Sequence, residues 1–109
     1  MVRVPMSAAA AALFRALLIR AGDRDRILLS EFRSTDWQSM TFAGERHVIA
    51  LRITGPSPDV ALDRLTAGLA DAEFDIPGQI VADIAVVGSP SRNADGSICL
   101  ELEALTIAE

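Results

Sequence analysis

The chain of 109 residues has room for one hydrophobic core, so we predict a single domain spanning residues 1–109. Half of its residues are apolar, which excludes a disordered chain and is high for a small monomer. Some apolar surface is therefore expected to lie between subunits. The formal net charge of −5 argues against nucleic-acid and membrane-surface partners, because both are bound chiefly through clustered basic residues.

The kinds of residue present narrow the chemistry further. All 10 basic residues are arginine, which excludes lysine Schiff bases and phosphate-loop lysines within this chain and, with frequent alanine, indicates a GC-rich bacterial genome. The one cysteine, Cys99, excludes an internal disulfide and favours a cytoplasmic location. With one histidine and no tyrosine, few groups remain for catalysis, and we expect no cofactor and no metal.

The first predicted element is a helix from Ala8 to Ala21, with Ser7 as its N-cap and Gly22 at its end. Its large apolar residues recur at three- and four-residue spacing and form one stripe: Leu13, Phe14, Leu17 and Leu18. Because Arg15 interrupts the apolar run, we interpret this segment as an amphipathic helix rather than an export signal or a membrane span. A turn at 22–25 follows it.

Three consecutive strands are predicted next, at 27–32, 36–43 and 46–53, joined by short turns into an antiparallel meander. Gly44-Glu45 between the second and third strands is typical of a type II′ hairpin turn, which requires a positive φ at Gly44. This turn would set the register of the meander. Its apolar face would then carry Ile27, Leu29, Met40, Phe42, Ile49, Leu51 and Ile53.

In the second half of the chain, one predicted helix is followed by two predicted strands. A second helix is predicted to begin at Pro58 after Ser57, and two more strands are predicted at 79–87 and 98–107, with a polar loop at 89–97 between them. The expected fold is therefore α+β, with a five-stranded antiparallel sheet and two helices in the order α-β-β-β-α-β-β.

One face of the predicted meander carries an apolar patch where alternation should give polar residues. We predict that these residues form an interface: Leu28, Phe32, Trp37, Val48 and Arg52. Trp37 with Arg52 across from it would form a cation–π contact, and both residue types are frequent at binding hot spots. Either the first helix or another molecule covers this patch, and the sequence leaves both alternatives open.

Four residues are candidates for binding a ligand at the rim of the sheet. His47 is the one side chain that titrates near neutrality, although an edge histidine that caps the core fits the pattern better. Asp83 and Glu103 are expected on the outward face of the last two strands, either opposite or diagonal to each other. They could form a cation-binding or acid–base site, or they could simply belong to a solvated face. Arg46 lies next to His47.

Two functional hypotheses follow. The first is a non-enzymatic interaction or structural domain that self-associates through the Trp37 face or a sheet edge. The second is a small-ligand-binding protein or small enzyme with a polar site near His47 or the Asp83/Glu103 pair. The first is favoured, because the residues that most catalytic mechanisms need are absent or occur once.

Overall fold

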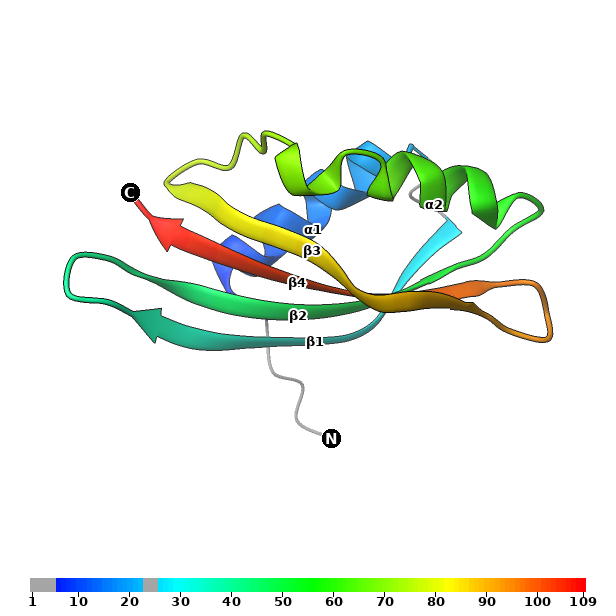
Figure 1. The fold of residues 1–109 in the computed structure, drawn as a ribbon, viewed down its shortest axis with the longest axis horizontal. Coiled ribbons are helices and arrows are strands. Elements are labelled where there is room, and N and C mark those ends of the chain that lie inside the picture. Colours follow the sequence, from blue (N-terminus) through cyan, green and yellow to red (C-terminus); the bar gives the residue numbers. More distant parts are fainter. Residues whose placement is uncertain (1–5, 23–25) are drawn as a thin grey trace.

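The computed structural model describes residues 6–22 and 26–109, so most of the turn predicted at 22–25 lies outside the described residues. The chain has an α+β fold in the order α-β-β-α-β-β. Its elements are α1 (Ala8–Ala21), β1 (Ile27–Gln38), β2 (Ala43–Ile53), α2 (Pro58–Thr66), the short 3-10 helix η2 (Leu69–Asp71), β3 (Gln79–Arg92) and β4 (Ile98–Ala108). The strands form one 4-stranded antiparallel sheet in the order β1-β2-β4-β3, with both helices on the same side (Figure 1).

The predicted five-stranded sheet and its order α-β-β-β-α-β-β are wrong. The first two predicted strands are one continuous strand, β1, which pairs with β2 at 11 positions. Ser34, in the predicted break, lies inside β1 opposite His47. The hairpin turns later, where Ser39 donates its backbone N–H to Phe42 O at 2.9 Å. Phe42 and the fully exposed Met40 therefore lie in a loop and not on the apolar face.

Gly44 has a different role from the predicted one. Its φ is not positive, so the predicted type II′ turn and the register built on it are wrong. Gly44 lies inside β2, between Trp37 of β1 and Ile107 of β4. A Cβ atom at this position would lie 2.0 Å from the backbone oxygen of Thr106. Glycine is needed here because β2 and β4 approach each other closely, and not because the chain turns.

Helix α1 begins and ends where the sequence predicts. The Ser7 Oγ accepts a hydrogen bond from the Ala10 backbone N–H at 3.1 Å, and Gly22 ends the helix with a left-handed φ of 85°. Leu13 and Leu17 of the predicted stripe are fully buried. No helix among the described residues is long and apolar enough to cross a membrane.

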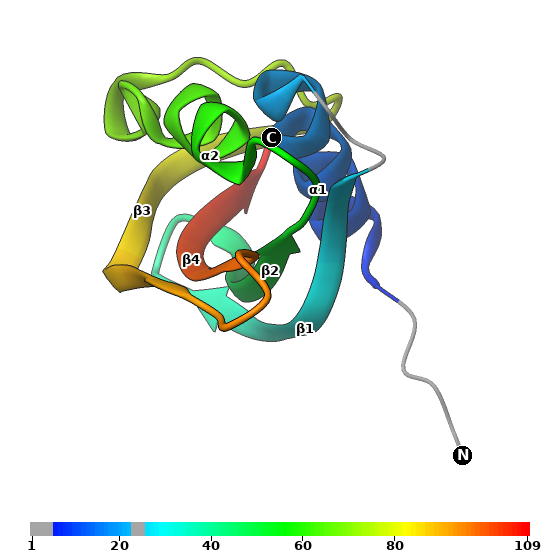
Figure 2. The same cartoon turned by 90° about the vertical axis from the view of Figure 1, so that its right-hand side faces the viewer.

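The core lies between the helices and the concave side of the curved sheet, with α1 toward β1 and α2 toward β3 (Figure 2). Its largest fully buried aliphatic side chains are Leu13, Leu17, Ile49, Leu51, Ile53, Leu65 and Leu102, and burial of each contributes roughly 1.5–3 kcal/mol. Arg20 joins the two helices, because its Nε donates to Leu65 O at 3.0 Å and a second guanidinium nitrogen donates to Ala67 O. These are carbonyls at the end of α2, where a cation is favourable.

Candidate interaction surface

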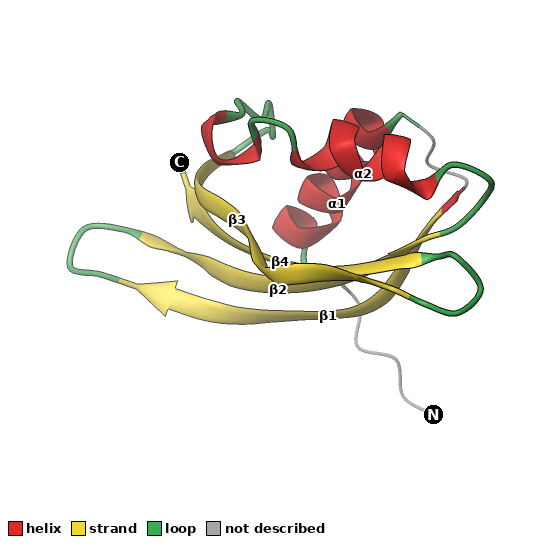
Figure 3. Cartoon of the chain, turned by 45° about the vertical axis from the view of Figure 1, so that its right-hand side comes forward, coloured by secondary structure: helices red, strands yellow, loops and turns green. Residues whose placement is uncertain are grey.

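The side of the sheet opposite the helices is covered by no described element (Figure 3). We call it the open face. It consists of the strand positions that alternate with the buried ones. All four strands contribute apolar residues to it, none of them fully buried: Leu28, Trp37, Val48, Ala50, Ile80, Ala85, Val87, Leu105 and Ile107. The sequence left open whether the first helix covers the face that carries Trp37. In the structure both helices cover the other face.

One row of the open face is apolar across the whole sheet. The strand register places Trp37, Gly44, Ile107 and Ile80 side by side on β1, β2, β4 and β3. An aromatic side chain opposite a glycine can cover the surface that the glycine lacks. Simple alternation along β3 predicts Ile80 on the core face with Ile84, and this prediction is wrong, because the register shift between Val81 and Asp83 moves Ile80 to the open face. The Ile107 position was not identified from the sequence, although the alternation of β4 continues to apolar residues at its C-terminal end.

Four of the five predicted interface residues lie on the open face: Leu28, Trp37, Val48 and Arg52. Phe32 does not, because it pairs with the buried Ile49 and therefore belongs to the helix side. The cause is a bulge at Ser30, where the register with β2 shifts by one residue and the side-chain alternation of β1 reverses. The same bulge places Trp37 outward.

The predicted contact between Trp37 and Arg52 is also wrong. Arg52 pairs with Leu28 and Cys99 at the opposite end of the strands. Its guanidinium forms an ion pair with Asp95 and donates from Nε to the Ser97 Oγ at 3.0 Å. Arg52 is therefore held by its own chain.

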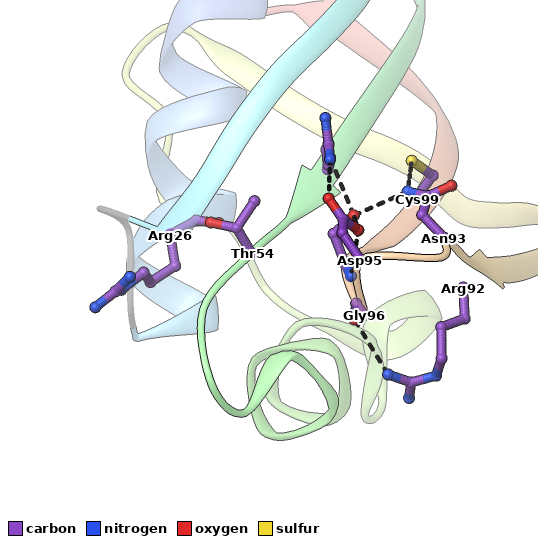
Figure 4. Close-up of polar contacts among 9 residues, drawn as sticks. Arg26, Thr54, Arg92, Asn93, Asp95, Gly96 and Cys99 are labelled. Atoms are coloured by element: carbon purple, nitrogen blue, oxygen red, sulfur yellow. Dashed lines mark hydrogen bonds and ion pairs between the residues drawn. The ribbon is translucent and has the colours of Figure 1, made fainter.

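Ser97 organises the polar cluster in the β3–β4 loop, part of which Figure 4 shows. The buried Ser97 hydroxyl donates to Asp95 Oδ1 at 2.6 Å and accepts from Asn93 Nδ2 at 2.9 Å, and Asn93 Nδ2 also lies 3.1 Å from Cys99 Sγ. The hydrogen bonds from the Ser97 hydroxyl and backbone N–H, together with Arg52, lower the pKa of Asp95 to about 2. Every polar group named here has a partner, which indicates a structural cluster.

His47 is not at the rim of the sheet, because it is fully buried on the helix side. Its Nδ1 lies 2.8 Å from the Ser34 Oγ of β1 and its Nε2 lies 2.8 Å from the Thr106 Oγ1 of β4. Burial lowers the pKa of His47, and the nearby Glu45 opposes this shift only partly. The neutral ring thus connects three strands through two hydroxyl groups. No pattern in the sequence pointed to these two partners.

The remaining ligand-binding candidates lie on the other side of the sheet from His47. Arg46, Asp83 and Glu103 are all on the open face. Of the two arrangements predicted for the carboxylates, the diagonal one is confirmed, because Asp83 pairs with Leu105 and Glu103 pairs with Ala85. Arg46 also pairs with Leu105, so this leucine lies between the arginine and Asp83. The four candidates therefore do not form one site.

Other kinds of site have little support in the described part of the chain. No group of three or more His, Cys, Asp or Glu side chains there could hold a metal ion. A shallow depression of about 440 Å³, lined by residues 72–81 and Glu109, contains none of the four ligand-binding candidates.

The fold and the open face together define a two-layer α+β protein in which one face of the sheet is covered by helices and the other is not. Comparison of the chain with protein-family models, with curated proteins and with solved structures gave no match.

Proposed function

We propose that this protein is a non-enzymatic interaction domain that forms a dimer by placing its open face against that of a second copy. The observation that carries the proposal is that both helices lie on one side of the sheet, while the other side has an apolar row that includes Trp37. An apolar sheet face is normally covered by another layer, and contiguous exposed apolar patches mark interaction sites.

The size of the open face suits a dimer. Strands of 11 or more residues in a 4-stranded sheet present a face of roughly 600 Å² in projection. A stable interface buries about 800 Å² of accessible surface on each partner. Side chains standing above the sheet add to the projected area, so the open face alone approaches this value.

The sheet edges are less suited to association than the face. The edge strand β3 has register shifts after Val81 and after Val87, and it contains Pro90, which has no backbone N–H to donate. The other edge strand, β1, has its bulge at Ser30 and carries several charged side chains. Bulges, proline and charge are the usual means by which proteins prevent edge pairing.

The alternative of a ligand-binding or catalytic site at the rim has less support. His47 is buried with both ring nitrogens hydrogen-bonded, and Arg46, Asp83 and Glu103 lie on the opposite face.

The expected location of the protein is a bacterial cytoplasm. This expectation rests on the single cysteine and on the use of arginine alone as the basic residue.

Replacement of Trp37 by Glu tests the proposal, because it adds a charge to the apolar row. We expect the parent protein to have the mass of a dimer by light scattering at micromolar concentration and the Trp37→Glu variant to be a monomer. Leu105→Glu, also on the open face, should have the same effect and serves as a second variant if Trp37→Glu does not fold.

The matched control is Ile19→Glu, which adds the same charge at an exposed apolar residue of α1, on the other side of the molecule. This variant should keep the mass of the parent. A monomeric parent would contradict the proposal, as would folded variants at Trp37 and Leu105 that remain dimers.

A further inference from the structure

The charged residues of the open face are separated by sign. The half formed by β1 and β2 carries three arginines, Arg33, Arg46 and Arg52, and one carboxylate, Glu31. The half formed by β4 and β3 carries three carboxylates and no basic residue: Asp83, Glu101 and Glu103. One half of the open face is therefore mainly positive and the other half is negative, in a chain whose net charge is −5.

Most of these charges have no ion-pair partner among the residues that the structure describes. Among the described residues the ion pairs are Arg52 with Asp95 and Arg92 with Asp59. Neither involves Arg33, Arg46 or the three carboxylates of the negative half. These groups are therefore available to a second molecule whose charges are arranged in the opposite order, and a second copy of the same face turned over provides that order.

We infer that the twofold axis of the dimer runs parallel to the strands, so that the β1–β2 half of each copy lies on the β4–β3 half of the other. This inference rests on the proposed function and specifies its geometry. With this axis, positive and negative halves face each other twice, as an isologous interface requires. With an in-plane axis perpendicular to the strands, β2 would lie on β2 and β4 on β4, and like charges would meet.

The apolar residues agree with the axis parallel to the strands. Rotation about that axis keeps each row of the sheet at its own level. Trp37 then lies over Ile80 of the second copy, and Ile107 of the second copy lies over the space above Gly44. Arg46 lies over Leu105 of the second copy, whose neighbours on the same face are Asp83, its partner on β3, and Glu103, two residues along β4. Apolar residues meet apolar residues, and the charges lie around them.

Charge reversal tests this geometry. In the Arg46→Glu homodimer, two glutamates would face negative halves, and in the Glu103→Arg homodimer two arginines would face positive halves. We expect each variant to dimerise roughly tenfold or more weakly than the parent, because two favourable contacts become repulsive. An equimolar mixture should recover parent-like affinity, because the heterodimer has one native and one reversed pair. Arg15→Glu, an exposed change of the same charge on α1, is the control.

The mixture is important because Arg46 and Glu103 are also diagonal neighbours within one chain. A double variant would restore their attraction inside the chain as well as between chains. If the two single variants recover affinity only when they are mixed, the restored attraction acts between the two chains and not within one chain. If like halves faced each other instead, neither single homodimer would be weaker than the parent, and the inference would be wrong.

Distance measurement provides a readout that does not depend on charge. The fully exposed Met40 lies in the β1–β2 loop, at one end of the strands. In a Met40→Cys, Cys99→Ser chain, a spin label attached at position 40 can be measured against its copy by pulsed electron resonance. With the axis parallel to the strands, both loops lie at the same end of the dimer, and the spacing of strands and sheets places the two loop backbones roughly 15 Å apart.

With the perpendicular axis, the loops lie at opposite ends of a dimer whose subunits are 46 Å long, which separates the labels by more than roughly 40 Å. A long distance in a dimer that Trp37→Glu still dissociates overturns this inference and leaves the proposed function intact. A parent protein that is monomeric overturns both. A short distance together with recovery in the mixture supports the inference.

Discussion

The two faces of the sheet are built from alternate residues of the same strands, yet their side chains have opposite surroundings. On the helix side, Ile49 and Leu102 are fully buried, and even the polar His47 has both ring nitrogens hydrogen-bonded. On the open face, Val48 and Leu105 remain partly exposed, and most charges have no described ion-pair partner. The helix side stabilises the fold, and we propose that the open face binds another molecule.

The largest expected difference between the two faces is in the free energy of unfolding that is lost when a leucine of β4 is replaced by alanine. Leu102→Ala should lower the free energy of unfolding by about 2–5 kcal/mol, because it leaves a cavity in the core. Leu105→Ala, on the same strand but on the open face, should cost less than about 1 kcal/mol in the monomer and should weaken the dimer. Urea unfolding at a protein concentration below the dimer dissociation constant measures both. Equal losses would mean that Leu105 is covered within its own chain.

A smaller effect is expected at Gly44, where an added Cβ atom would lie 2.0 Å from the backbone oxygen of Thr106. Gly44→Ala should destabilise the fold by about 1–3 kcal/mol, because the added Cβ meets the backbone of β4 and cannot be accommodated by a rotamer change. Thermal unfolding followed by circular dichroism would measure this loss. The control is Ala43→Val, which enlarges the neighbouring exposed residue of β2 and should change stability by less than about 0.5 kcal/mol. A Gly44→Ala variant as stable as the parent would show that β2 and β4 are farther apart.

The smallest effect concerns the pH dependence of the helix side. Because burial lowers the pKa of His47, the unfolded chain binds a proton there at a higher pH than the folded chain does. The stabilisation from neutral His47 is complete above its ordinary pKa of 6.5 and is lost as the pH falls through the lowered value. Asp95 does not contribute in this window, because its folded pKa is about 2.

Urea unfolding of the parent and of His47→Gln between pH 8 and pH 5 isolates this contribution. The variant should cost about 1–3 kcal/mol at pH 8, where the hydroxyl groups of Ser34 and Thr106 lose a partner. The difference between the two proteins should shrink toward pH 5. Dimerisation of the variant should match that of the parent, since His47 lies away from the open face. A constant difference across this range would contradict the lowered pKa.

Elements that depend on local interactions were predictable from the sequence. The bounds of α1 and the beginning of α2 at Pro58 follow from caps, proline geometry and the spacing of apolar residues within a few positions of each other. The outward placement of Asp83 and Glu103 follows from simple alternation along two strands. None of these features requires contacts between distant parts of the chain.

Only the tertiary structure decided the rest. Pairing with β2 at 11 positions keeps β1 continuous through Ser34, where local preference favoured a turn, because the ladder outweighs turn propensities that are small for single residues. The bulge at Ser30 then decides that Trp37 faces outward and Phe32 faces the helices. Alternation in a sequence defines two faces for every strand, but which face is buried depends on where the helices pack, and that is decided by the free energy of the whole fold.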